Sequence, residues 1–331
     1  MLDGTTMLLK CCALAGLVCA ILAAADEAVV VVHKGADSIG IYKTKDGAAV
    51  ATIPVGKAPH ELVLSAGERL AYVTNYGVGS YTSMEPGGNS ISIIDLEKRA
   101  PAGEIVLGDY HRPHGIERGA SGRLYVTVDF PPAVLVIDPA ARKVVKAHKL
   151  EDTMPHMIVL TRDESKAYVG CSGSASVAII DLTNGATNSI EVGGVPMGLT
   201  LSPDERRVFA TTRTANNVAV IDTATAKLRT AIAIPGQPVR LRISPDKRWL
   251  VVTTIGSGEA FAVDLLTLKP TYKVPIGRAA EGIEFDHKGA FFYVTAQGDN
   301  KIVKVSTDTW RPVLEIKTGE RPDTPAIFGL K

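Results

Sequence analysis

Three of the seven histidines in this 331-residue chain stand at the same place in a recurring motif, directly after a proline: His60, His114 and His156. Neutral imidazole is a common ligand of zinc, manganese, iron and nickel. Glu281 and Asp323 stand at the equivalent place later in the chain. Three imidazoles on one ion leave positions open for water, and a carboxylate can take a proton from that water. The pattern therefore predicts a divalent metal site at the three histidines, with Glu281 and Asp323 as catalytic groups.

The same residues also have a purely structural interpretation. A histidine at the start of a strand can donate a hydrogen bond to a neighbouring carbonyl, and a carboxylate can pair with a nearby arginine such as Arg240, Arg278 or Arg321. The chain has no local metal-binding motif that brings the three histidines together, so the metal hypothesis depends on the fold.

Further residues are candidates for binding a ligand. Tyr110, His111 and Arg112 directly precede Pro113 and could bind an anionic group, although Arg112 could equally form a salt bridge. Arg240 could orient the same group, because it follows the repeat position of its own unit. These four side chains are predicted to lie around one ligand.

The first repeat unit contains an insertion of about 12 residues, at 77–88, which is rich in glycine and carries Tyr81 and Met84. Long loops on a regular scaffold often carry function. We expect a lid or specificity loop with Tyr81 in contact with the ligand; a neutral insertion would have the same composition.

Internal repetition indicates what positions these residues. The position after the repeat proline falls at residues 60, 114, 156, 197, 239, 281 and 323, and every step but the first is 41 or 42 residues. Each unit contains short β-branched runs separated by turns, which is typical of a small antiparallel sheet. Seven such units predict an all-β fold, a seven-bladed β-propeller with four-stranded antiparallel blades. The seven occupants of this ring position are His60, His114, His156, Met197, Val239, Glu281 and Asp323.

The two ends of the chain are expected to share one blade. Residues 28–55 provide three strands before the first repeat proline, and residues 322–331 provide one inner strand after the last. Pairing these pieces would close the ring, so loss of either end should destabilise the fold.

The Tyr-Val-Thr-Asn run at 72–75, the Ser-Pro-Asp turns at 202–204 and 244–246, and the strands ending in Ile-Asp resemble the YVTN-repeat β-propeller family of the YncE-like kind. The resemblance implies an exported bacterial propeller, distantly related to lactonase-type propellers and to the haem-binding propeller of cytochrome-type nitrite reductase. A family named for its repeat implies no particular reaction. One member is reported to bind DNA, but a net charge of +1 makes a nucleic acid partner unlikely here.

Residues 1–25 have the form of a secretory signal peptide. Lys10 precedes an apolar run from Cys11 to Ala24, and small residues lead to a cleavage point near Ala25. The run is shorter than the ~20 residues of a membrane-spanning helix. The prediction is a periplasmic or secreted protein with a single domain at 26–331, no membrane span after cleavage, and Cys171 as its one free cysteine.

Two classes of function stay open. The chain has no glycine-rich phosphate loop and no serine-nucleophile elbow. We favour a monomeric binding or scaffold protein that takes a small molecule, a haem-like cofactor or a periplasmic protein at the channel mouth. The alternative is a metal-assisted hydrolase or lyase, lactonase-like, in which the ion is Zn, Mn, Fe or Ni.

Overall fold

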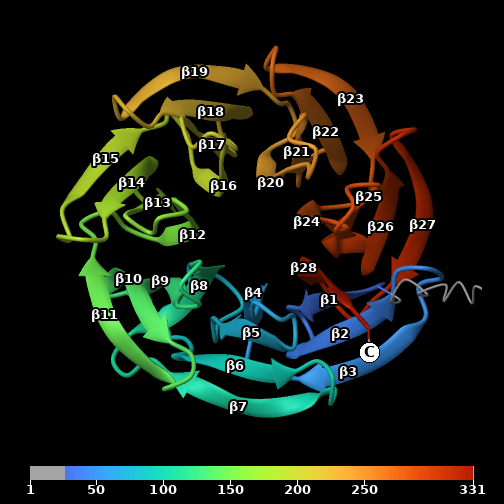
Figure 1. The fold of residues 1–331 in the computed structure, drawn as a ribbon, viewed down its shortest axis with the longest axis horizontal. Helices are drawn as coiled ribbons and strands as arrows, with labels where there is room; N and C mark the ends of the chain where they lie inside the picture. The colour runs from blue at the N-terminus through green and yellow to red at the C-terminus, as the bar shows by residue number, and fades with distance from the viewer. Residues whose placement is uncertain (1–26, 331) are drawn as a thin grey trace, which may run out of the picture.

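The structure, a computed structural model, describes residues 27–330 as seven four-stranded antiparallel sheets arranged in a ring around a central channel (Figure 1). The sequence-based prediction of a seven-bladed propeller is therefore confirmed. The predicted signal peptide lies outside the described residues. No helix within residues 27–330 is long and apolar enough to cross a membrane.

We number the blades from the first repeat proline. Blades 1 to 3 contain β4 (Pro59–Leu64), β5 (Leu70–Asn75), β6 (Ser90–Asp95), β7 (Ala100–Val106); β8 (His111–Arg118), β9 (Leu124–Phe130), β10 (Pro132–Asp138), β11 (Lys143–Lys149); and β12 (Pro155–Leu160), β13 (Lys166–Cys171), β14 (Ser176–Asp181), β15 (Thr187–Glu191). Blades 4 to 6 contain β16 (Pro196–Leu201), β17 (Arg207–Thr212), β18 (Asn217–Asp222), β19 (Lys227–Ala233); β20 (Pro238–Ile243), β21 (Trp249–Thr254), β22 (Glu259–Asp264), β23 (Lys269–Pro275); and β24 (Ala280–Phe285), β25 (Phe291–Ala296), the short 3-10 helix η1 (Gln297–Asp299), β26 (Lys301–Ser306), β27 (Arg311–Lys317).

Blade 7 joins the two ends of the chain. It contains β28 (Pro322–Gly329), β1 (Glu27–His33), β2 (Ser38–Lys43) and β3 (Ala49–Pro54), in that order from the channel outwards. The antiparallel pairing of β1 with β28 places Ala28 opposite Phe328, as the expected closure requires. The ring is therefore held shut by backbone hydrogen bonds between segments that are about 300 residues apart.

Apolar side chains on the middle strands fill the spaces between neighbouring blades. The ring centroids of Trp249 and Trp310, for example, lie 5.2 Å apart in the core shared by blades 5 and 6. Cys171 of blade 3 is fully buried in the core and makes no disulfide within residues 27–330. These strands are buried on both faces, which explains why β-branched residues dominate them.

In four of the seven blades the threonine of the repeat motif links the inner strand of its own blade to that of the next. The buried Thr127 hydroxyl accepts a hydrogen bond from the N–H of Gly115 in its own blade at 2.8 Å, and donates one to the carbonyl of His156 in the next blade at 2.7 Å. The equivalent threonines in blades 1, 4 and 5 make the same two contacts, and they are Thr74, Thr211 and Thr253. This bridge fixes the ring position of one blade against the second strand of the blade before it.

Candidate functional site

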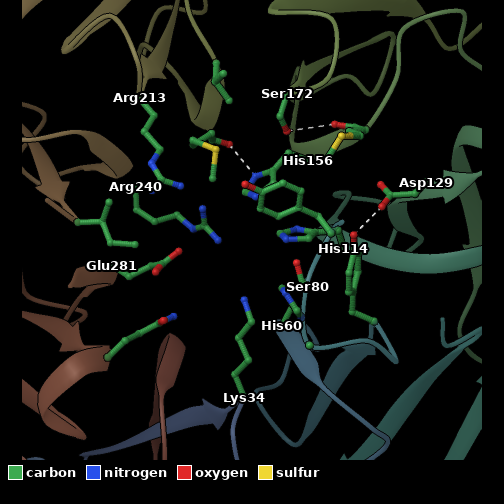
Figure 2. A pocket seen from close by; sticks show the side chains of 18 of the residues that line it. Lys34, His60, Ser80, His114, Asp129, His156, Ser172, Arg213, Arg240 and Glu281 are labelled. Carbon is green, nitrogen blue, oxygen red and sulfur yellow. Dashed lines mark hydrogen bonds between the residues drawn. The ribbon is translucent and has the colours of Figure 1, made fainter. Parts of the chain in front are cut away.

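A cavity of about 360 Å³ lies at the mouth of the channel, on the face where the ring positions begin the inner strands (Figure 2). Of the seven ring residues, five contribute to its walls: His60, His114, His156, Met197 and Glu281. The other two, Val239 and Asp323, are fully buried. The propeller thus brings the three histidines and Glu281 together at one mouth, as the repeat spacing indicates.

The histidines form one wall of this cavity. The ring centroids of His60 and His114 are 4.7 Å apart, and those of His114 and His156 are 3.9 Å apart with a tilt of 36°. Tyr76 packs against His60 at 4.6 Å. Burial lowers the pKa of all three histidines well below its usual range. This wall is consequently neutral at physiological pH.

Backbone carbonyls fix the orientation of two of the imidazoles. His60 Nδ1 lies 3.0 Å from the carbonyl oxygen of Ala58, and His156 Nδ1 lies 3.0 Å from that of Met197. Because a carbonyl only accepts, each Nδ1 must carry the proton, and a neutral ring then has its lone pair on Nε2. His114 Nδ1 is buried with no hydrogen-bond partner among the described residues.

A glycine in the repeat makes the His156 contact possible. Gly170 of β13 stands where Thr74 and Thr127 stand in blades 1 and 2, so blade 3 has no hydroxyl to donate to the Met197 carbonyl. The His156 Nδ1–H donates to this carbonyl instead. The one blade among these that lacks the threonine bridge is therefore the blade whose ring histidine takes over the free acceptor.

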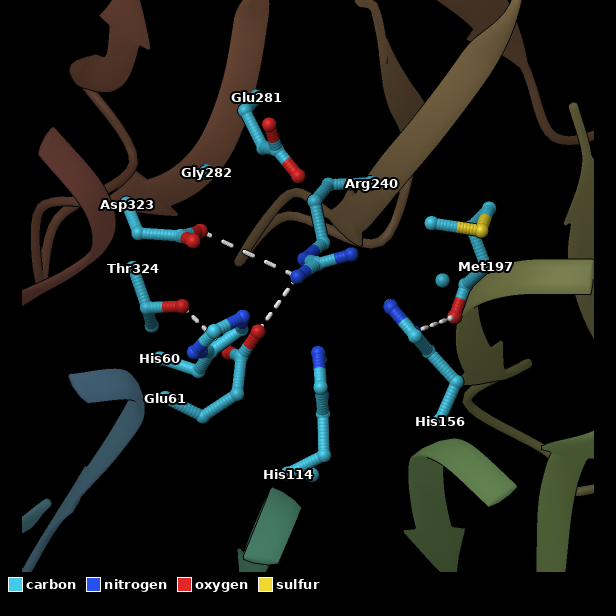
Figure 3. Close-up of polar contacts among 12 residues, drawn as sticks. His60, Glu61, His114, His156, Met197, Arg240, Glu281, Gly282, Asp323 and Thr324 are labelled. Carbon is cyan, nitrogen blue, oxygen red and sulfur yellow. Dashed lines mark hydrogen bonds and ion pairs between the residues drawn. The ribbon is translucent and has the colours of Figure 1, made fainter. Parts of the chain in front are cut away.

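The opposite wall is charged. Arg240 of blade 5 makes an ion pair with Glu61 of blade 1 across the channel, and its Nη2 lies 3.9 Å from Asp323 (Figure 3). Lys34, from the turn between β1 and β2, lies 3.6 Å from Asp323. The Arg240, Glu61 and Asp323 side chains are all at least nine-tenths buried, so this network lies largely out of contact with bulk water.

Burial and like charges perturb the carboxylates of the network. Burial, together with the neighbouring charge of Asp323, raises the pKa of Glu281 to about 7. Burial also raises the pKa of Glu61. Burial alone would lower the pKa of Arg240. The nearby carboxylates of Glu61, Glu281 and Asp323 outweigh burial and raise this pKa above its usual value, so Arg240 is a permanent positive charge.

Several buried polar atoms in and below the cavity have no hydrogen-bond partner among residues 27–330. They are Nε and Nη1 of Arg240, both carboxylate oxygens of Asp323, Nδ1 of His114 and Nε2 of Gln297. Buried polar groups in native proteins are nearly always paired with protein, water or ligand. This cluster of unpaired atoms beside a cavity is what a ligand-binding site requires.

Sequence reasoning missed three residues of the site, which are Lys34, Glu61 and Tyr76. Tyr76 follows the Tyr-Val-Thr-Asn run directly, and its hydroxyl donates to Asp129 at 2.6 Å, where burial raises the pKa of the aspartate to about 6. Glu61 is adjacent to His60, but the irregular start of β4 brings it into the channel as well. Tyr76 and Glu61 are therefore neighbours of motifs that the sequence shows, but only the folded backbone shows that their side chains face the channel mouth.

The structure gives Arg112 a different partner from the one expected. Its side chain is 3% exposed, and its guanidinium donates to the carbonyls of Tyr81, Ser83 and Glu85 at 3.3, 2.6 and 2.6 Å. It thus fastens the 77–88 insertion and does not line the cavity. Its donors serve the loop in this structure, and the predicted contact of Arg112 with a ligand stays a prediction.

The other candidates differ in position. Tyr81 does line the cavity, together with its neighbours Gly79 and Ser80, while Met84 at the tip of the loop is 98% exposed. Tyr110 and His111 are absent from the cavity wall. Asp323 lies beneath it and faces Lys34 and Arg240. A ligand in the cavity would therefore meet Tyr81 and Arg240 among the five predicted binding residues.

The arrangement does not fit a metal ion as it stands. In the part of the chain that the structure describes, no group of three His, Cys, Asp or Glu side chains is placed to hold one. His114 and His156 instead pack ring against ring, with centroids 3.9 Å apart and a tilt of 36°. The metal site stays a prediction.

The fold and this site define a repeat β-propeller with a polar cavity at the channel mouth. The family model described as YNCE-like beta-propeller matches residues 162–326. The chain is a YncE-like seven-bladed propeller. No curated protein matches it.

Solved structures with the same architecture are distant in sequence. A functionally unknown protein from Desulfotomaculum acetoxidans DSM 771 is 12% identical with a TM-score of 0.75, covering 92% of this chain and 99% of its own. Kuenenia stuttgartiensis hydrazine synthase is 20% identical with a TM-score of 0.67, covering 80% of this chain and 88% of its own. The dihydro-heme d1 dehydrogenase NirN in complex with DHE is 14% identical with a TM-score of 0.66, covering 91% of this chain and 75% of its own. At these identities the likeness concerns the fold alone.

Proposed function

We propose that this protein is an exported binding protein that takes a small molecule into the cavity at the channel mouth. The observation that carries the proposal is the set of buried polar atoms without a partner within residues 27–330, Nε and Nη1 of Arg240 and Nδ1 of His114, beside a cavity of about 360 Å³. That volume lies within the usual range of small-molecule pockets, which combine apolar walls with a few convergent polar groups. Met197 and Ile255 supply apolar surface here.

Export is part of the proposal and rests on the form of residues 1–25. Mass spectrometry of protein recovered from the periplasmic fraction or medium of the expressing cells tests it. The mature chain is expected to begin at or near Asp26. Recovery of the full-length chain in the cytoplasmic fraction alone would contradict export.

A blocked cavity tests the binding role. Met197 lines the cavity, so the Met197→Trp variant fills it, whereas Leu266→Trp adds the same ring at a position that is 93% exposed. Thermal shifts with a diverse small-molecule library should yield compounds that stabilise the wild type and Leu266→Trp but not Met197→Trp. The proposal fails if no compound stabilises the wild type, or if every stabilising compound acts equally on Met197→Trp.

The second candidate is a metal-assisted hydrolase or lyase. It is favoured by one observation: His60 and His156 each donate Nδ1–H to a carbonyl, which is the outer-shell contact that metal-binding imidazoles usually have. The three side chains, as placed within residues 27–330, do not form a group that could hold an ion, so we derive no catalytic step for Glu281 or Asp323.

Metal analysis decides between the two candidates. The purified protein is incubated with Zn, Mn, Fe and Ni and then separated from free metal. Stoichiometric metal in the wild type that is lost from a His60→Ala, His114→Ala, His156→Ala variant would support the hydrolase. A protein that stays free of metal would exclude it.

A further inference from the structure

The two walls of the cavity differ in a way that restricts the ligand. One wall presents the rings of His60, Tyr76, His114 and His156, packed at centroid distances of 3.9–5.6 Å. These imidazoles are neutral because they are buried. A row of neutral rings is a surface suited to another planar ring, because offset and edge contacts between aromatic groups are favourable.

The facing wall offers hydrogen-bond donors for an anion (Figure 2). Arg240 uses Nη2 for Glu61, and its Nε and Nη1 have no partner within residues 27–330. The Lys34 ammonium is 3.6 Å from Asp323, which is longer than a hydrogen bond. Farther out, Arg213 and Arg321 also line the cavity. Guanidinium groups bind planar carboxylates well, since their donors form a fixed fork.

The acidic groups nearby do not offset this preference. Glu61 and Asp323 lie beneath the cavity and face Arg240 and Lys34. Glu281 lines the cavity, but its pKa of about 7 means that near neutral pH it is protonated in much of the population, and a protonated carboxyl can donate to an anion. Asp129 accepts the hydroxyl of Tyr76.

We propose that the cavity binds a planar aromatic carboxylate, with its ring against the imidazoles and Tyr76 and its carboxylate towards Arg240 and Lys34. This inference rests on the proposed function and specifies the ligand class. The apolar third side, which includes Val195, Met197 and Ile255, is in keeping with a hydrocarbon ring edge. Each property of the ligand therefore has its own wall: planarity, negative charge and an apolar rim.

Four probes of similar size separate these properties. Benzoate is planar and anionic, benzamide is planar and neutral, cyclohexanecarboxylate is anionic but not planar, and benzylamine is planar and cationic at neutral pH. Calorimetric titration of the full mature protein should give the tightest binding for benzoate, by about tenfold over each of the others, since charge-assisted hydrogen bonds and stacking each contribute on that scale.

Variants locate the binding. Arg240→Gln removes the main donor but also disturbs a buried network, so Lys34→Gln serves as the second variant, with the exposed Lys57→Gln as its control. Benzoate binding should weaken about tenfold in Lys34→Gln and stay unchanged in Lys57→Gln. Met197→Trp should abolish it.

The outcomes distinguish the two proposals. If benzamide or benzylamine binds at least as tightly as benzoate and Met197→Trp removes that binding, the carboxylate inference is overturned while the binding function stands. If library compounds bind in the cavity but benzoate does not, the inference is again overturned. If nothing binds there, both proposals fall.

Discussion

The ring at the channel mouth has two halves that satisfy buried polar groups differently. In blades 1 to 3 the ring residues are histidines that become neutral on burial, and two of them donate to backbone carbonyls. In blades 5 to 7 the channel residues are charged: Arg240 pairs with Glu61 of blade 1, and Asp323 lies 3.6 Å from Lys34 of its own blade and 3.9 Å from Arg240 of blade 5.

The difference shows that equivalent repeat positions need not have equivalent energetics. A neutral imidazole can be satisfied by the backbone of the same or the next blade, so the histidine half depends on short-range geometry. A buried charge needs an opposite charge, and for Arg240 the partner, Glu61, lies across the channel. The charged half therefore depends on closure of the complete ring.

The largest effect is expected from removing the central charge. Arg240→Met leaves Glu61 and Asp323 buried without their cation and should lower the free energy of unfolding by about 3–5 kcal/mol. The comparison variant is Arg242→Met, two residues along β20. Arg242 is 42% exposed and pairs with Glu284, so its loss should lower the free energy of unfolding by at most about 1 kcal/mol. Urea unfolding measures both. Equal losses in the two variants would show that the channel network contributes no more than a surface pair.

A smaller loss in the free energy of unfolding is expected for a change in the histidine half. Thr127→Val removes the hydroxyl that serves the Gly115 N–H and the His156 carbonyl, and should cost about 1–3 kcal/mol because both groups stay buried. Thr127→Ser retains the hydroxyl and is the control. The same unfolding assay applies, and a Val variant as stable as the Ser variant would contradict the bridging role of the threonine.

The third prediction concerns pH. The folded protein raises the pKa of Glu281 from 4.5 to about 7, so it binds a proton more tightly than the unfolded chain does. This group's stabilising contribution is complete below pH 4.5 and is lost as pH rises through about 7. The groups that act on it are Asp323, Arg240, Lys34 and Glu61.

Glu281→Gln removes this dependence. Between pH 6.5 and 8.5 the melting temperature of the wild type should fall more steeply than that of the variant. His287 has a raised pKa and acts in the same direction, but it is present in both proteins and cancels in the difference. The buried histidines act at lower pH because their pKa is lowered. Parallel curves for the two proteins would refute the assignment.

The smallest expected effect is a change in the NMR signals of His156 when Gly170 is replaced. Gly170→Thr supplies the hydroxyl that blade 3 lacks and should compete with His156 for the Met197 carbonyl. Gly170→Ala is the control, because both variants add a Cβ that meets the end of the flexible Leu199 side chain at 2.7 Å. Nitrogen-detected NMR should show the His156 Nδ1–H tautomer in the wild type and in Gly170→Ala, and a loss of it in Gly170→Thr. An unchanged tautomer in all three would mean that the glycine has no part in orienting His156.

Much of the site followed from the repeat. The period of 41 or 42 residues placed His60, His114, His156 and Glu281 on one ring, and the structure brings all four to the same cavity. The period could not show that Arg112 serves the 77–88 loop, because that loop is unique to one unit and has no equivalent with which to compare it.

The sequence by itself determined the number of blades, their strands, the closure and the identity of the ring residues, because each of these depends on local patterning that recurs along the chain. Only the tertiary structure decided which groups face each other across the channel. The pairing of Glu61 with Arg240, 179 positions apart, and the ring contact between His114 and His156 depend on side-chain directions set by irregular strand starts and by a closed ring. No periodicity encodes such directions, since they arise only when all seven blades are in place.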